Sequence, residues 1–175
     1  MTKLSPRFKM AIAYFAGVLS MPLAILLVAL SGLAPVAGTA SPPAWEEAIG
    51  RTALHNALAR RAGEDKNPLS PGDDVLRAGM RLFRNNCAGC HGDGRDPSPW
   101  GSKNFYPRVP QFGQSAPDLS AEEIYVAVRY GVRYSGMGAW DGLMKEEDMW
   151  KVATFLDRLD ALPPAVNQAW RAPTQ

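Results

Sequence analysis

Two cysteines three positions apart, followed at once by a histidine, constrain this 175-residue chain more than any other feature of its sequence. The stretch reads Cys87-Ala88-Gly89-Cys90-His91. Two thiols at this spacing on a helix can reach both vinyl groups of one porphyrin, and the next residue brings an imidazole under the iron. The motif therefore predicts one covalently attached haem c, tethered by Cys87 and Cys90, with His91 as the proximal iron ligand.

Two other uses of a CxxC pair fit this chain less well. A thioredoxin-like dithiol would require a βαβ setting and no obligatory histidine. A structural zinc site needs about four nitrogen or sulfur ligands, and the chain offers only Cys87, Cys90, His91 and the distant His55. Since one haem uses both cysteines, we expect neither a second attached haem nor a disulfide.

A helix is predicted to lead into the motif from Ser70-Pro71-Gly72-Asp73, which combines a hydroxyl cap, an early proline and an acidic residue. Its apolar positions recur at helical spacing, so one face is expected to be buried. Gly79 lies on that face. A glycine inside a helix costs about 1 kcal/mol relative to alanine, so Gly79 is expected to mark close contact with another backbone.

Two further helices are predicted after the motif. A capping box at Ser120-Ala121-Glu122-Glu123 begins the first, and Gly131 is a natural end for it. The second runs from about Lys145 to Ala161, with apolar residues at i, i+3, i+4 and i+7, and stops before Pro163-Pro164. The predicted fold class is therefore all-α.

Residues 70–163 resemble a class I, or monohaem, cytochrome c. The resemblance rests on Gly79 and Phe83, on the haem motif with Gly92, on the loop Gly136-Met137-Gly138-Ala139-Trp140, and on Trp150 and Phe155 in the closing helix. It implies an all-α class I cytochrome c fold around one haem, with the first and last helices crossing at Gly79. It also implies that Met137 is the second axial ligand and that the function is one-electron transfer.

The residues themselves favour Met137 as the sixth iron ligand. Met137 sits between two glycines in a non-helical loop, where a backbone can approach a flat cofactor closely. Met80 and Met149 fit helix core positions, whereas Met144 stays an alternative; Met1, Met10 and Met21 lie in the N-terminal segment. With both axial positions filled, the iron has no easy site for a substrate, so we expect an electron carrier and not an enzyme, with no small-molecule substrate.

The stretch between His91 and Ser120 is rich in Pro, Gly and Asp and is predicted to be a loop against the haem. The resemblance implies that a proline carbonyl from this loop orients His91, and Pro99 and Pro107 are both candidates. We expect Trp100, Tyr106 and Trp140 to line the haem pocket, with Trp140 donating to a propionate. The alternative for each aromatic side chain is ordinary core packing.

The N-terminal segment determines the expected location. The run from Met10 to Thr39 contains no charged residue and exceeds the roughly 20 residues that span a bilayer. We therefore expect a retained transmembrane anchor, although cleavage after Ala40 is an open alternative. Positive charges at Lys3, Arg7 and Lys9 indicate a cytoplasmic N-terminus, which would put the haem domain on the periplasmic side of a bacterial cytoplasmic membrane.

The predicted order is a signal anchor or transmembrane helix (residues 1–39), a linker with a short amphipathic helix (40–69), the haem domain (70–163) and a C-terminal tail (164–175). The linker helix, from Trp45 to about Arg61, could lie on the bilayer, pack against another subunit or act as a spacer. His55 within it is interpreted as a surface residue.

These features together predict a membrane-anchored cytochrome that passes single electrons between redox proteins on the periplasmic side, or within a respiratory or photosynthetic complex. The net charge of +2 is slight and gives no indication of nucleic-acid binding. The alternative is a haem-based sensor or haem enzyme in which the sixth ligand is displaceable.

Overall fold

The computed structural model describes residues 5–63, 65–113 and 115–173, and the described residues form helices and loops without a strand. The chain divides into two compact units, Met1–Ala37 and Gly38–Gln175. The prediction of an all-α fold is confirmed. Met1, Lys3 and the last two residues of the predicted tail lie outside the described residues.

The first unit consists mainly of α1 (Pro6–Leu30). Ser5 caps this helix, because its hydroxyl accepts a hydrogen bond from the Phe8 amide at 3.3 Å. All 25 residues of the helix are exposed, and none is buried. The helix is long and apolar enough to cross a membrane, a property that signal sequences share.

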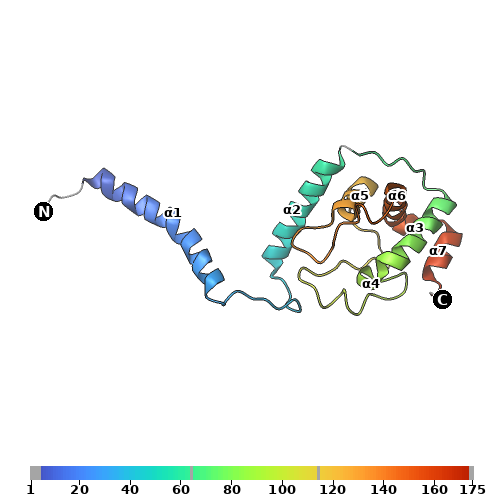
Figure 1. The fold of residues 1–175 in the computed structure, drawn as a ribbon, viewed down its shortest axis with the longest axis horizontal. Coiled ribbons are helices and arrows are strands. Elements are labelled where there is room, and N and C mark those ends of the chain that lie inside the picture. The colour runs from blue at the N-terminus through green and yellow to red at the C-terminus, as the bar shows by residue number, and fades with distance from the viewer. Residues whose placement is uncertain (1–4, 64, 114, 174–175) are drawn as a thin grey trace. The chain divides into compact units, whose positions relative to one another are not determined.

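The second unit is built around the crossing of α3 (Asp73–Asn86) and α6 (Glu146–Asp157), which Figure 1 shows beside each other. The two backbones meet at Gly79. A Cβ atom at that position would lie 2.1 Å from the Lys151 carbonyl oxygen and 2.8 Å from Phe155 Cβ. Only glycine permits this approach, so the prediction of a close backbone contact at Gly79 is confirmed.

Helix α5 (Ala121–Tyr130) packs against α6 and completes the centre of the core. Its capping box forms as predicted: Ser120 Oγ accepts from the Glu123 amide, and Glu123 Oε2 accepts from the Ser120 amide. Tyr125 is fully buried, and its ring stacks on Trp150 at 3.8 Å between centroids. Gly131 ends the helix with a φ of 69°, a conformation that favours glycine.

The linker region contains α2 (Ala44–Ala62), whose C-terminal half packs against α5 through Leu58 and Ala62. This contact with its own domain was not among the three predicted locations for the helix. The N-terminal half stays exposed, with 66% of Trp45 and 63% of Ile49 accessible. His55 Nε2 donates to the Asp118 carbonyl at 2.7 Å and is partly exposed, which agrees with the prediction of a surface residue.

The C-terminal region corrects the sequence interpretation. Residues 164–175 were predicted to be a tail, but α7 (Pro164–Arg171) follows a short 3₁₀ turn, η1 (Leu159–Ala161), and packs against α3. Val166 and Trp170, one helical turn apart, are both fully buried. The helix forms because Pro164 suits a first helical turn and because these two side chains complete the core.

Candidate haem-binding site

The short helix α4 (Ala88–His91) carries the motif and continues almost directly from α3. The Cys87 amide bonds to the Phe83 carbonyl at 2.7 Å, and the His91 amide bonds to the Cys87 carbonyl at 2.9 Å. Both thiols are free and partly buried. Burial, with a further contribution from the nearby Cys90, raises the pKa of Cys87 to about 12.

The His91 imidazole is oriented by its second nitrogen. Nδ1 lies 2.9 Å from the Pro110 carbonyl oxygen; because a carbonyl can only accept, Nδ1 carries the proton and Nε2 keeps its lone pair. The Phe112 ring stacks on the imidazole at 4.9 Å with 8° between the planes. Burial lowers the pKa of His91, whereas the Pro110 bond opposes this shift. The neutral imidazole is the form that ligates a metal.

The identity of this proline is a correction to the sequence analysis, which named Pro99 and Pro107 as the candidates. Neither accepts the bond; Pro110 does. The Phe112 amide donates to the His91 carbonyl at 3.0 Å, and this bond brings residues 110–112 alongside the imidazole. No local sequence signal distinguishes the three prolines, because the path of the loop is determined by bonds to α4.

Two polar residues that sequence reasoning missed, Ser98 and Gln111, attach the loop to α4. Ser98 Oγ donates to the Gly89 carbonyl at 2.6 Å, and Gln111 Nε2 donates to the Cys90 carbonyl at 3.0 Å. Gln111 Oε1 also accepts from the Ser98 amide at 2.7 Å. Together with the Phe112 amide, which donates to the His91 carbonyl, these bonds pair three successive carbonyls of α4. The last carbonyls of a helix have no partners within the helix, so the loop supplies them.

Helix α7 holds the other side of the loop. Trp170 Nε1 donates to the Gly113 carbonyl at 3.3 Å, and Arg171 Nη1 donates to the Gly94 carbonyl at 3.0 Å. A Cβ atom on Gly94 would lie 2.1 Å from the Trp170 carbonyl oxygen. Arg84 Nη2, from α3, donates to that same carbonyl at 2.7 Å. The predicted tail is therefore part of the support of the His91 loop.

Met137 lies in the loop between α5 and α6 and is partly buried against the hydrophobic core. Its carbonyl accepts from the Val132 amide at 3.0 Å, and its amide donates to Ser135 Oγ at 3.1 Å. A Cβ atom on Gly131 would lie 2.7 Å from the Met137 carbonyl oxygen. These contacts give the loop a defined conformation, while the role of Met137 as an iron ligand stays a prediction.

The positions of Met80, Met149 and Met144 agree with the sequence analysis, which assigned the first two to helix core positions. Met80 and Met149 are buried, with 6% and 2% of their surfaces exposed, and belong to the core between the helices. Met144 is partly buried next to the core, and its amide donates to the Trp140 carbonyl at 3.0 Å.

The aromatic residues predicted for the pocket lie in different places. Trp140 packs against the core, and its amide donates to the Val128 carbonyl at 3.1 Å. Tyr106 instead donates its hydroxyl to Glu46 Oε1 of α2 at 2.6 Å, and this bond raises its pKa. Trp100 is 57% exposed, and Pro107 is exposed beside Tyr106. Their contacts with a cofactor stay predictions.

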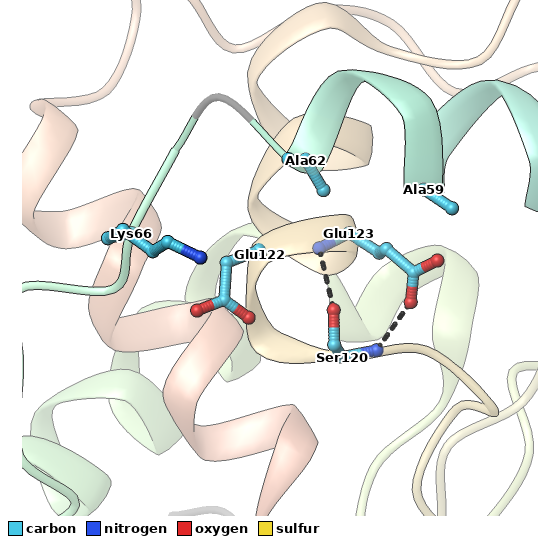
Figure 2. Close-up of a pocket in the computed structure, with 7 residues that line it drawn as sticks. Ala59, Ala62, Lys66, Ser120, Glu122 and Glu123 are labelled. Atoms are coloured by element: carbon cyan, nitrogen blue, oxygen red, sulfur yellow. Dashed lines mark hydrogen bonds between the residues drawn. The ribbon is translucent and has the colours of Figure 1, made fainter.

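A shallow depression between α2 and α5 lies apart from these ligand residues. Figure 2 shows its wall, with the capping box of Ser120 and Glu123 at its base and Lys66 and Glu122 at one side. None of its lining residues is a predicted haem ligand; they are Ala59, Ala62, Gly63, Lys66, Ser120, Glu122 and Glu123.

Comparison with known families identifies the section of chain that carries the motif. Residues 74–156 match the family described as cytochrome C oxidase, cbb3-type, subunit III. This chain contains a monohaem c-type cytochrome domain. The cytochrome domain therefore binds haem c and acts as a haem-based electron carrier. Searches of curated proteins and of solved structures gave no significant match.

The residues of this cytochrome domain suit the chemistry of a haem c. Cys87 caps the start of α4 and Cys90 lies within that helix, and both are free thiols. His91 Nε2 keeps its lone pair because Nδ1 is committed to Pro110. A histidine nitrogen and a methionine sulfur are a common axial pair for haem iron, and Met137 can supply the sulfur. The donor set thus fits the group that the family implies.

Proposed function

We propose that this protein is a membrane-anchored cytochrome c that passes single electrons between redox proteins on the periplasmic side of a bacterial cytoplasmic membrane. It does so alone or as a subunit of a larger respiratory or photosynthetic complex. One haem is attached covalently through Cys87 and Cys90, and its iron is ligated by His91 and Met137.

The observation that carries this proposal is the fixed orientation of His91 beside two free thiols. The Pro110 carbonyl holds Nδ1 at 2.9 Å, so the ring can neither rotate freely nor present its protonated nitrogen to a metal. A bound haem supplies the one-electron iron couple, and a thioether ligand favours its reduced form. The protein holds both axial ligands in place, so that the site rearranges little when the iron gains or loses an electron.

The anchor is supported by α1 and by the charges beside it. Arg7 and Lys9 occur at the start of α1, and no acidic or basic residue follows until Glu46. Positive residues are retained on the cytoplasmic side, which favours a periplasmic haem domain. Tethering raises the effective concentration of the domain near membrane partners, so weak and reversible contacts suffice for electron exchange.

The test is an optical spectrum of the full-length, haem-loaded protein, oxidised and reduced, compared with Met137→Ala. We expect a low-spin spectrum with a weak absorption band at the red end in the oxidised protein, and loss of that band in the variant. Met144→Ala is the matched control, because this methionine is also partly buried near the same loop; it should keep the band. A high-spin wild type would indicate an open sixth position and favour a sensor or an enzyme. A band unaffected by Met137→Ala would show that another residue, such as Met144, holds the sixth position.

A further inference from the structure

The residue immediately before Met137 is in contact with an aromatic ring from a distant part of the chain. A Cβ atom on Gly136 would lie 2.5 Å from both Cδ1 and Cε1 of Phe105. The ring therefore packs directly on the bare backbone of the Met137 loop. Any larger residue at position 136 would have to move either the ring or the loop.

Phe105 is itself held from two sides. Its ring meets the ring of Trp100 edge to face, with centroids 4.6 Å apart. Its carbonyl accepts a hydrogen bond from Arg108 Nη1 at 3.3 Å, and the same nitrogen donates to the Lys103 carbonyl. Rotation of the ring away from Gly136 would break its contact with Trp100, and movement of its backbone would break the bond to Arg108.

Arg108 also binds the segment that leads into α2. Nη1 donates to the Gly38 carbonyl at 3.3 Å, and Nη2 donates to the Thr39 carbonyl at 2.7 Å. A guanidinium can make these bonds together because it presents several N–H groups in a rigid plane; a lysine ammonium cannot reproduce that geometry. One side chain thus joins the loop under Phe105 to residues 38–39.

We propose that Phe105 is a positioning residue for Met137 and that Arg108 holds Phe105 in its place. This inference rests on the proposed function in one respect, that Met137 ligates the iron. The bonds to Val132 and Ser135 shape the loop locally, whereas the Phe105 ring blocks movement of Gly136 toward it. Loss of this support increases the fraction of molecules in which the sixth position is open, and an external ligand then binds more tightly in proportion.

The sharpest test is a pair of variants made singly and together in the full-length, haem-loaded protein. In Gly136→Ala, the new methyl group collides with Phe105, so the red-end band should weaken and imidazole should bind the oxidised protein about tenfold more tightly. Phe105→Leu removes the support and should shift both readouts in the same direction. The double variant should recover toward wild type, since the smaller leucine leaves room for the methyl group.

Matched controls separate this role from general destabilisation. Phe105→Tyr keeps the ring and should retain the band. Gly50→Ala adds the same methyl group to α2, where a Cβ atom would have no neighbour within 4 Å, and should leave imidazole binding unchanged. Arg108→Lys keeps the charge but loses the planar arrangement of donors, so it should resemble Phe105→Leu.

Amide hydrogen exchange gives a readout that does not depend on the iron. The Val132 and Met137 amides, which are bonded within the loop, should exchange faster in Phe105→Leu and Arg108→Lys than in wild type. A double variant no better than Gly136→Ala, or unchanged exchange in both other variants, would overturn the positioning role. If Met137→Ala keeps the band, the proposal that Met137 ligates the iron fails. The amide exchange rates of Val132 and Met137 then still show whether Phe105 supports the loop.

Discussion

At the scale of single residues, Gln111 contributes more to the His91 site than its place in an irregular loop suggests. Its side chain donates to the carbonyls of Cys90 and Val109 and accepts from the Ser98 amide. Leucine at this position would fill a similar volume and leave all three backbone groups without this partner. A fully buried polar group that loses its hydrogen-bond partner costs about 1–3 kcal/mol. These three groups are only partly buried, so water can replace part of what is lost.

We therefore expect Gln111→Leu to lower the free energy of unfolding by about 2 kcal/mol, measured by chemical denaturation of the haem-loaded protein. Gln168→Leu, a substitution of an exposed glutamine on α7, serves as the control and should change stability by less than about 0.5 kcal/mol. Equal effects of the two substitutions would contradict the role of Gln111.

Tyr106 provides a pH-dependent contact between its loop and α2. The bond to the Glu46 carboxylate raises the pKa of Tyr106 above its ordinary value. Since the folded pKa is the higher one, the stabilisation is present below the unfolded value, about 10, and is lost as the pH rises through the folded value. The contact should thus persist at neutral pH and release only in alkali.

The Tyr106 ring can be followed by NMR during an alkaline titration of protein labelled at tyrosine. Glu46→Gln should move the Tyr106 transition to lower pH, because the neighbouring negative charge is removed. Glu47→Gln should leave it in place, since Glu47 pairs with Arg51 on the same helix. An unchanged transition in Glu46→Gln would show that the Glu46 charge does not act on Tyr106.

At the scale of elements, α7 illustrates how a short helix can support a distant loop. Trp170 is fully buried, lies edge to face with Phe83 and Phe155, and donates to the Gly113 carbonyl. Removing a buried tryptophan side chain leaves a cavity, so Trp170→Ala should cost about 3–5 kcal/mol of unfolding free energy.

Thermal unfolding of the haem-loaded protein measures this loss as a lower midpoint. Trp45→Ala is the matched control on α2: its side chain is 66% exposed, so it should shift stability by less than about 0.5 kcal/mol. A midpoint for Trp170→Ala close to that of wild type would mean that α7 does not contribute to the folded domain.

At the scale of the whole molecule, the proposed anchor predicts that the full chain fractionates with membranes. An arginine near the middle of a membrane-spanning helix costs about 2.5–3.5 kcal/mol of insertion free energy. Leu19→Arg should therefore move a large share of the protein to the soluble fraction. Leu33→Arg, beyond the end of α1, should leave the distribution unchanged, and the same distribution for both variants would argue against α1 as the anchor.

Local patterns predicted those parts of the protein that depend on neighbouring residues. The capping box of α5, the glycine that ends it and the buried face of α3 all follow from residue types at helical spacing. The haem motif is equally local, because its three donors fall within five residues. Gly79 also indicated a close backbone contact. Glycine is unfavourable inside a helix, so it is expected there where a larger side chain does not fit.

The tertiary structure alone decided which proline orients His91, because the amide of Phe112 and the side chain of Gln111 determine where the loop turns back. It likewise decided that residues 164–171 belong to the domain and that α2 covers α5. Such contacts join residues far apart in the chain, and their formation depends on shape and on unpaired backbone groups that no local period encodes. The sequence by itself determined the cofactor chemistry and the main helices; the packing of loops determined how His91 is held.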